Sequence, residues 1–429
     1  MKKYLLILLS FITILSFNLH AQSPAVPQNS PIRLIGGTVH VGNGTVIENG
    51  IITFEKGKLT YAGSASEFKD DDKPYLDFNV SGKQIYPGLI LCNSILGLSE
   101  ISAEKATNDF YETGDFNPNV RSLIAYNADS EKIPILRSNG ILLSQITPRG
   151  GTVSGSSSVV NLDAWNWEDA VLKADEGIHF FWPSKFNPPQ RRMGETEPKP
   201  NENYEKIIQS IEKNLMDALA YTKQSNPERT NLKLNSMKGL FDGNSTLYLH
   251  VNKAAEIIKS IQLMQKCNVD KIVLVGAADA YYVKDFIKQY DIPVILNTTH
   301  RLPSRPEEDV TLPYKLPYLL NKENILMTIE NNRAANTSNL AFVAGTAAAY
   351  GLTKEEALSM ITINPARILG IEHRVGTIEV GKDATIIVSD GDLLDMKSNK
   401  VELAFIEGRM IDLDNKHKRL YRKFKAKYE

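Results

Sequence analysis

The side chains best suited to metal or acid–base chemistry in this sequence are its histidines, and they are widely scattered. Seven occur among 429 residues, with no H-x-H or H-E-x-x-H spacing. His179 and His250 fall in apolar stretches that read as buried strands. A zinc ion that activates water needs about three protein ligands and an open position. The histidine pattern therefore does not predict a conventional zinc hydrolase.

A glycine-rich stretch from Pro148 to Gly155 offers a second possible site. It lacks the lysine of a phosphate-binding P-loop and has no G-x-G-x-x-G spacing. The serines that follow do not form the G-x-S-x-G turn of a serine hydrolase. We interpret this stretch as a turn between strands, with an anion-binding loop as the alternative.

Apolar strands alternate with helical patterns through the middle of the chain. The strand candidates are Gly88 to Cys92, Ile141 to Gln145, Ser158 to Leu162, Ile178 to Trp182, Leu247 to His250, Ile272 to Val275, Pro293 to Leu296 and Ile325 to Ile329. Apolar residues recur at helical spacing from Ile207 to Leu219 and from Ile257 to Met264. This alternation predicts an α/β protein with a parallel sheet, and its length suits a (β/α)8 barrel.

The two regions that flank this alternating part of the chain have a different pattern, in which short β-rich runs are separated by turns. These runs extend from Pro31 to Tyr86 and from Gly376 to Ile411. Residues near Ile32 to Leu59 and near Thr377 to Ile411 are expected to share one β-sandwich, although the barrel separates them in sequence.

Three ordered motifs resemble the metal-dependent amidohydrolase superfamily, especially its imidazolonepropionase-like branch. They are Gly82 to Ile90, Ile363 to Gly370, and Val375 to Ile378 with the following Gly381 to Ala384. The resemblance implies a (β/α)8 TIM-like barrel inserted into a small β-sandwich built from both chain ends. It divides the chain into sandwich residues 22–86, barrel residues 87–370, and a second sandwich part with a basic tail at 371–429.

The resemblance also implies where the family's metal ligands should lie, and most of these positions carry other residues. The matching positions are Asn93 and Ile95 on strand 1, Ser184 on strand 4, Asn252 on strand 5, Gly276 on strand 6 and Glu330 on strand 8. Lys185 is an alternative on strand 4. A shift of two residues on strand 5 makes His250 the matching residue, with a barrel-lining role for this histidine as the other interpretation.

Metal-dependent hydrolysis of non-peptide C–N bonds is the activity that the family implies. The substituted ligands favour a pseudoenzyme with no metal cofactor, acting as a ligand-binding protein or as a non-catalytic partner of an active amidohydrolase paralogue or of a second copy. The alternative is an active hydrolase with an atypical or mononuclear zinc or other divalent-metal site, using Glu330 and His250. Glu330 is then the candidate catalytic residue.

Composition and the amino terminus limit the partners and the location. A net charge of −1 and 42% hydrophobic residues favour a globular protein without broad nucleic-acid binding. Residues 1–21 have the layout of a signal peptide, which predicts an exported protein, periplasmic or secreted, with no membrane span.

Cys92 and Cys267 are expected at opposite ends of the barrel, too far apart for a disulfide. The basic tail from Lys416 to Lys427 favours a solvated helix, with docking on an acidic partner or lipid surface as the alternative.

Overall fold

The computed structural model describes residues 23–189, 196–224, 229–303, 305, 307–331 and 337–429. The predicted signal peptide at 1–21 lies outside the described residues. Within the described part, no helix combines the length and the apolar composition needed to cross a bilayer.

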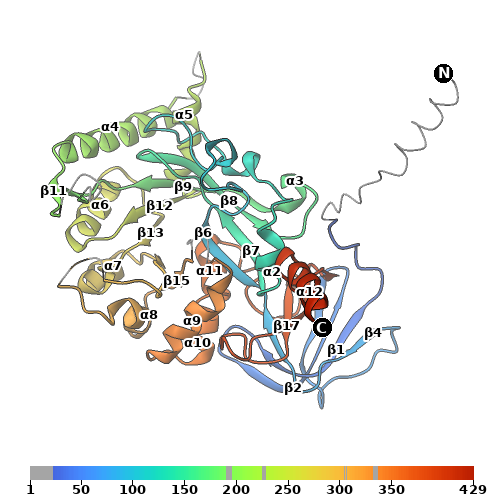
Figure 1. Ribbon diagram of the computed structural model, residues 1–429. Helices are drawn as coiled ribbons and strands as arrows, with labels where there is room; N and C mark the ends of the chain where they lie inside the picture. Colours follow the sequence, from blue (N-terminus) through green and yellow to red (C-terminus); the bar gives the residue numbers. More distant parts are fainter. Residues whose placement is uncertain (1–22, 190–195, 225–228, 304, 306, 332–336) are drawn as a thin grey trace, which may run out of the picture.

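Strands from both chain ends form one mixed sheet, on the side of the molecule where β1, β2 and β17 lie in Figure 1. Its strands, in spatial order, are β18 (Arg409–Met410), β17 (Val401–Ile406), β16 (Ile386–Ser389), β5 (Gln84–Pro87), β1 (Ile32–His40), β2 (Val46–Glu55) and β3 (Lys58–Ser64), with β4 (Leu76–Asn79) beside β1. The two ends meet where β5 pairs antiparallel with β16. The predicted shared β unit is confirmed; its being a two-layered sandwich stays a prediction.

Apolar side chains from both ends hold this sheet together. Leu34, Ile52 and Ile386 are fully buried in one cluster. The rings of Phe54 and Phe405 meet edge to face at 5.1 Å. Burial of this kind stabilises by roughly 1.5–3 kcal/mol for each large side chain, so the sheet needs both ends of the chain.

A second sheet of eight strands forms a nearly closed barrel. In spatial order the strands are β6 (Leu89–Ser94), β7 (Ile141–Ile146), β8 (Val153–Asn161), β9 (Val171–Phe181), β12 (Thr246–Val251), β13 (Ile272–Gly276), β14 (Val294–Leu296) and β15 (Met327–Ile329). The helices are α2 (Ile133–Arg137), α3 (Trp167–Ala170), α4 (Tyr204–Thr222), α5 (Leu232–Ser236), α6 (Ala254–Lys266), α7 (Lys284–Gln289), α8 (Leu312–Lys322), α9 (Leu340–Ala349), α10 (Lys354–Ser359), α11 (Ile363–Leu369) and α12 (Lys416–Tyr428).

One strand breaks the regular (β/α)8 pattern that we predicted. Strand β8 runs antiparallel to both β7 and β9, whereas the strands from β9 to β15 are parallel and alternate with helices. Only residues 147–152 separate β7 from β8. A parallel crossover needs a dozen or more residues, so this link can only make a hairpin. The interpretation of the glycine-rich stretch as a turn is confirmed, and Gly150 and Gly151 adopt positive φ there.

Among the described residues, no ladder pairing joins β15 to β6. Helix α11 packs against both strands. The backbone N–H of Ile90 donates to the carbonyl of Ile361 at 3.0 Å. The hydroxyl of Thr328 donates to the carbonyl of Met360 at 2.8 Å. These contacts bridge the opening in the ring.

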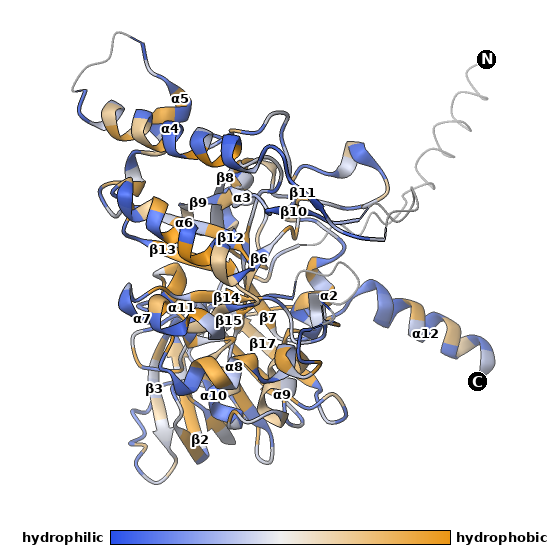
Figure 2. Ribbon diagram, turned by 90° about the vertical axis from the view of Figure 1, so that its left-hand side faces the viewer, coloured by the Kyte–Doolittle hydropathy of each residue, from blue (hydrophilic) through white to orange (hydrophobic). Residues whose placement is uncertain are grey.

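The remaining elements lie at the periphery. A two-stranded hairpin, β10 (Phe186–Asn187) with β11 (Lys199–Pro200), precedes α4. Helix α12 buries no residue and projects from the body in Figure 2, so the predicted terminal helix is confirmed. Cys92 and Cys267 are both buried and free, as predicted.

Candidate functional site

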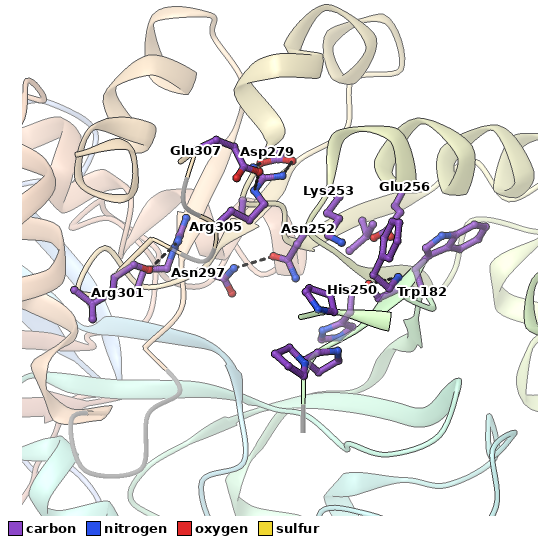
Figure 3. A pocket seen from close by; sticks show the side chains of 18 residues that line it. Trp182, His250, Asn252, Lys253, Glu256, Asp279, Asn297, Arg301, Arg305 and Glu307 are labelled. Carbon is purple, nitrogen blue, oxygen red and sulfur yellow. Dashed lines mark hydrogen bonds and ion pairs between the residues drawn. The ribbon is translucent and has the colours of Figure 1, made fainter. Parts of the chain in front are cut away.

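Two adjoining cavities open where the parallel barrel strands end at their carboxyl termini. The inner cavity has a volume of about 330 Å³ and the outer cavity about 940 Å³. They share four lining residues, Trp182, His250, Asn252 and Asn297, so we treat them as one cleft. Figure 3 shows the outer part, with Asn252 facing Asn297 at its floor.

The inner cavity brings together most of the residues that we placed at metal-ligand positions. Its lining consists of Asn93, Arg149, Phe181, Trp182, His250, Asn252, Val275, Gly276, Asn297 and Glu330. Two predicted residues lie elsewhere. Ile95 packs against the hydrophobic core, and Ser184 lines only the outer cavity because it follows the end of β9 by three residues. Lys185 is exposed and lines neither cavity.

Asn93 enters the cavity through a local distortion of β6. Its φ is +55°, in the left-handed region, and the pairing of β6 with β7 shifts register between Leu91 and Ser94. Asparagine tolerates this conformation better than most residues do. The side chain of Asn93 is 3% exposed, so its amide must find partners inside the protein.

Those partners are a guanidinium and a carboxylate. Arg149, in the short β7–β8 turn, donates from Nη1 to Asn93 Oδ1 at 2.6 Å and from Nη2 to the Asn93 carbonyl at 2.7 Å. The amide nitrogen of Asn93 donates to the carboxylate of Glu330. The side chain of Asn93 thus bridges the Arg149 guanidinium and the Glu330 carboxylate.

Asn93, Arg149 and Glu330 form a triad in which each of the two charged groups affects the pKa of the other. Burial raises the pKa of Glu330, while the Arg149 charge and the hydrogen bond from Asn93 act in the opposite direction. Burial also lowers the pKa of Arg149, and the Glu330 charge opposes that shift. Arg149 therefore supplies the positive charge that partly compensates the half-buried Glu330 carboxylate.

Gly276 is required by its positive φ and by the close approach of the Asn252 side chain. Its φ is +92°, and a Cβ at this position would lie 2.7 Å from Oδ1 of Asn252. The same Oδ1 accepts a hydrogen bond from Asn297 at 2.9 Å. A side chain cannot be added at Gly276 without moving this amide pair.

His250 connects the cleft to a buried polar network. Its Nε2 lies 2.9 Å from Nδ1 of His179, and Nε2 of His179 lies 2.8 Å from Oγ of Ser157. The Ser157 hydroxyl donates to Glu176 at 2.5 Å. Glu176 also accepts from the Tyr248 hydroxyl at 2.6 Å and from the Gln145 amide at 2.7 Å.

The donors around the inner cavity do not fit a zinc site of the kind that the family implies. No group of three or more His, Cys, Asp or Glu side chains positioned to hold a metal ion exists among the described residues. Asn93 and Glu330 bind each other, His250 binds His179, and Gly276 contributes no side chain. Zinc is bound by thiolate, imidazole or carboxylate ligands converging at about 2.0–2.3 Å.

The outer cavity combines apolar walls with paired charges. Trp182, Phe186 and Leu302 contribute apolar surface. Arg305 forms an ion pair with Asp279 at 2.6 Å, visible in Figure 3. Apolar walls with a few polar groups are typical of sites for small molecules.

Comparisons with known proteins agree with this architecture. The model of the amidohydrolase family matches residues 200–411. Imidazolonepropionase from Flavobacterium psychrophilum is 27% identical over 189 residues, 39% of this chain and 46% of that protein, so the match spans less than half of the relative. Imidazolonepropionase from Thermoplasma volcanium is 46% identical over 56 residues, 13% of this chain and 14% of that protein.

A solved structure extends the similarity in fold. A Thermotoga maritima amidohydrolase has a TM-score of 0.79 and 24% identity, covering 89% of this chain and 99% of that one. The chain thus has the barrel architecture of the amidohydrolases. Together, the family match, these relatives and this structure support the amidohydrolase superfamily and its imidazolonepropionase-like branch.

Sequence reasoning missed three residues of this site. Arg149 appeared only as part of a glycine-rich turn, and no local signal linked it to Asn93, which lies 56 residues earlier in the chain. Ser157 and Glu176 carried no local motif, because they meet only through the antiparallel pairing of β8 with β9.

Proposed function

We propose that this chain is an amidohydrolase-family protein that has lost the catalytic metal and binds a small molecule in the cleft. The observation that carries the proposal is the triad of Asn93, Arg149 and Glu330. The guanidinium provides, next to the strand-8 carboxylate, the positive charge that a metal ion would otherwise supply. Asn93 aligns with the first of the two strand-1 histidines that bind the metal in the family. Its side-chain amide forms hydrogen bonds with both charged groups.

The surroundings of Gly276 and His250 support the same proposal. A histidine at Gly276 would need a positive φ and would collide with Asn252. His250, the ligand in the alternative with a mononuclear site, uses Nε2 in its hydrogen bond with His179, which leaves only Nδ1 for a metal. Without a Lewis acid, water keeps its high pKa and ordinary amidohydrolase chemistry is negligible.

The size of the cleft favours a small ligand over a partner subunit. The outer cavity of about 940 Å³ falls in the range of roughly 300–1,000 Å³ typical of sites for small molecules. A partner subunit would require a broad interface instead, typically about 800 Å² on each side.

Elemental analysis of the mature protein, purified without chelators, tests the loss of the metal. We expect less than a stoichiometric amount of zinc, manganese or iron, and no activity in a screen of amides and lactams. Tightly bound metal at one or more ions per chain, with hydrolysis that disappears in Glu330→Ala, would overturn the proposal. If Arg149→Met has the same metal content and the same activity as the wild type, the triad is not the reason why the metal is absent.

A further inference from the structure

Four side chains form a continuous hydrogen-bonded path from a buried carboxylate to the cleft. The path runs from Glu176 through Ser157 and His179 to His250, with successive distances of 2.5, 2.8 and 2.9 Å. Glu176 and Ser157 are 3% and 0% exposed, and His179 is 0% exposed. Only His250 reaches the cavities, and it lines both of them.

When Glu176 is ionised, the donors around it set the direction of every hydrogen bond along the path. Tyr248, Gln145 and Ser157 all donate to the carboxylate. Because the Ser157 proton points to Glu176, its oxygen must accept from Nε2–H of His179. Nδ1 of His179 is then a lone pair that accepts from Nε2–H of His250.

This arrangement leaves Nδ1 of His250 as an unprotonated nitrogen on a ring that lines the cleft. The orientation of both rings is held by stacking. The His250 ring lies 3.9 Å from that of Phe181 at an angle of 15°, and the His179 ring lies 4.6 Å from that of Tyr248 at 8°. A base whose ring plane and tautomer are both fixed is preorganised to accept a proton.

The charged and titratable groups around the path disfavour a proton that stays on either imidazole. Burial lowers the pKa of His179 and His250 well below the usual value, and Arg149 adds to both shifts. Burial raises the pKa of Glu176, against the three hydrogen bonds and the charge of Lys173.

The other groups facing the path are weaker acids or line the inner cavity. Tyr248 stacks on His179, and its pKa is raised by burial and then by the charge of Glu176. Burial raises the pKa of Cys92, which faces Glu176 from β6. Glu330 lines the same inner cavity as His250, and the charge of Arg149 lowers its pKa against the effect of burial. Among the groups on the path, Glu176 is therefore the acceptor on which a proton rests.

We propose that these four residues form a proton relay whose entrance is Nδ1 of His250 and whose terminal acceptor is Glu176. A molecule in the cleft gives one N–H or O–H proton to Nδ1 of His250. Nε2 of His250 passes its proton to Nδ1 of His179, and Nε2 of His179 passes its proton to Ser157. The Ser157 proton moves to Glu176. The molecule becomes an anion, Glu176 becomes a neutral acid, and both histidines stay neutral with the proton now on Nδ1.

The class of ligand follows from the proton that the ligand must give up and from the anion that it becomes. The ligand is a neutral weak acid with an exchangeable N–H or O–H, and its developing anion faces the guanidinium of Arg149, which lines the same inner cavity. The ligand class rests on the proposed binding function of the cleft. The relay itself does not, and it can be tested in the free protein.

The test is a titration of the full mature protein, labelled with nitrogen-15 at histidine, from about pH 9 to about pH 5, a range that spans ordinary imidazole titration. Nitrogen-15 NMR reports the tautomers, and infrared difference spectra report the carboxylic-acid band. We expect both histidines to change from the Nε2–H to the Nδ1–H tautomer as the acid band of Glu176 appears, without formation of imidazolium.

Variants assign each signal and interrupt the path. Glu176→Gln should remove the infrared band, and His250→Asn should remove one of the two switching histidines. Ser157→Ala should abolish the tautomer change of both histidines. His417→Asn, on the exposed helix α12, is the matched control and should change neither signal.

Three results would overturn the relay. They are an imidazolium at either histidine, a Glu176 acid band without a tautomer change, and a carboxyl group that keeps one protonation state across the whole range. His250→Asn assigns one switching histidine in the titration, and imidazolium formation or the absence of a tautomer change in the wild type still refutes the relay if Ser157→Ala or Glu176→Gln fails to fold. A failed relay would leave the binding proposal intact, because that proposal depends on metal content and the triad.

Discussion

Replacing Arg149 by methionine should reveal how strongly the triad depends on its cation. Methionine keeps an unbranched stem but removes the two hydrogen bonds to Asn93, at 2.6 and 2.7 Å, and the charge that faces Glu330. Asn93 is 3% exposed and cannot turn to solvent for a new partner. The Glu330 carboxylate keeps its one hydrogen bond from Asn93 and loses the compensating charge.

The magnitude follows from what is left unpaired. Removing one partner of a fully buried ion pair costs about 3–5 kcal/mol, and a lost hydrogen bond to a charged group costs about 1.5–3 kcal/mol. Arg149 and Glu330 both retain some exposure, so water screens part of this cost. We expect Arg149→Met to lower the free energy of unfolding by about 2–4 kcal/mol at neutral pH.

The pH dependence separates lost charge from lost packing. Burial already raises the pKa of Glu330 in the folded state, and removing Arg149 raises it further. A carboxyl group with a raised folded pKa binds more protons folded than unfolded, so its contribution to stability falls as pH rises through that window. The destabilisation should be largest above the raised pKa and should shrink toward the ordinary glutamate value of about 4.3.

Urea unfolding of wild type and variant across this pH range measures the effect. Glu330→Gln in the Arg149→Met background should recover much of the loss, since the uncompensated charge is then gone. Arg121→Met is the matched control, because Arg121 pairs with Asp175 on the surface at 2.7 Å and 44% exposure; such a pair is worth about 1 kcal/mol or less. A loss that is independent of pH, or no larger than that of the control, would refute the reasoning.

Three further predictions concern the cleft, the thiols and the tail. Gly276→Ala should destabilise the protein by more than Gly243→Ala, because both have positive φ but only Gly276 also has a neighbouring atom within 3 Å; Gly243→Ala alone should cost about 1–2 kcal/mol by urea unfolding. Thiol titration should count two free thiols in denaturant and almost none in the native protein, because Cys92 and Cys267 are buried; a disulfide, seen as a count of zero in denaturant, contradicts this. Deleting residues 416–429 should leave the unfolding midpoint almost unchanged, since α12 buries no residue.

The sequence was sufficient to predict the barrel strands and the shared end sheet, because both depend on local patterns. Apolar runs marked most barrel strands within a few residues, but β8 begins five residues and β9 seven residues before its predicted range. The antiparallel direction of β8 escaped prediction because the strands predicted at 141–145 and 158–162 left a gap of about a dozen residues, enough for a parallel crossover, whereas the actual link is only residues 147–152.

At the site, the sequence predicted positions better than it predicted partners. Five expected residues meet in the inner cavity, including both Asn252 and its alternative His250. Ser184 lies in the outer part of the cleft and not in the inner cavity, because it follows the end of β9 at Phe181 by three residues. Hydrogen-bond partners such as Arg149 depend on long-range geometry, which no spacing rule encodes.

One structural departure accounts for both unexpected features of the site. The β7–β8 hairpin reverses β8, and its turn places Arg149 over Asn93. The same reversal pairs β8 antiparallel with β9, which brings Ser157 next to Glu176 and His179. The family match covers residues 200–411, after these strands in the chain. The guanidinium beside the strand-8 carboxylate and the path from His250 to Glu176 therefore both depend on this hairpin, and changes that restore a parallel β8 should remove the two together.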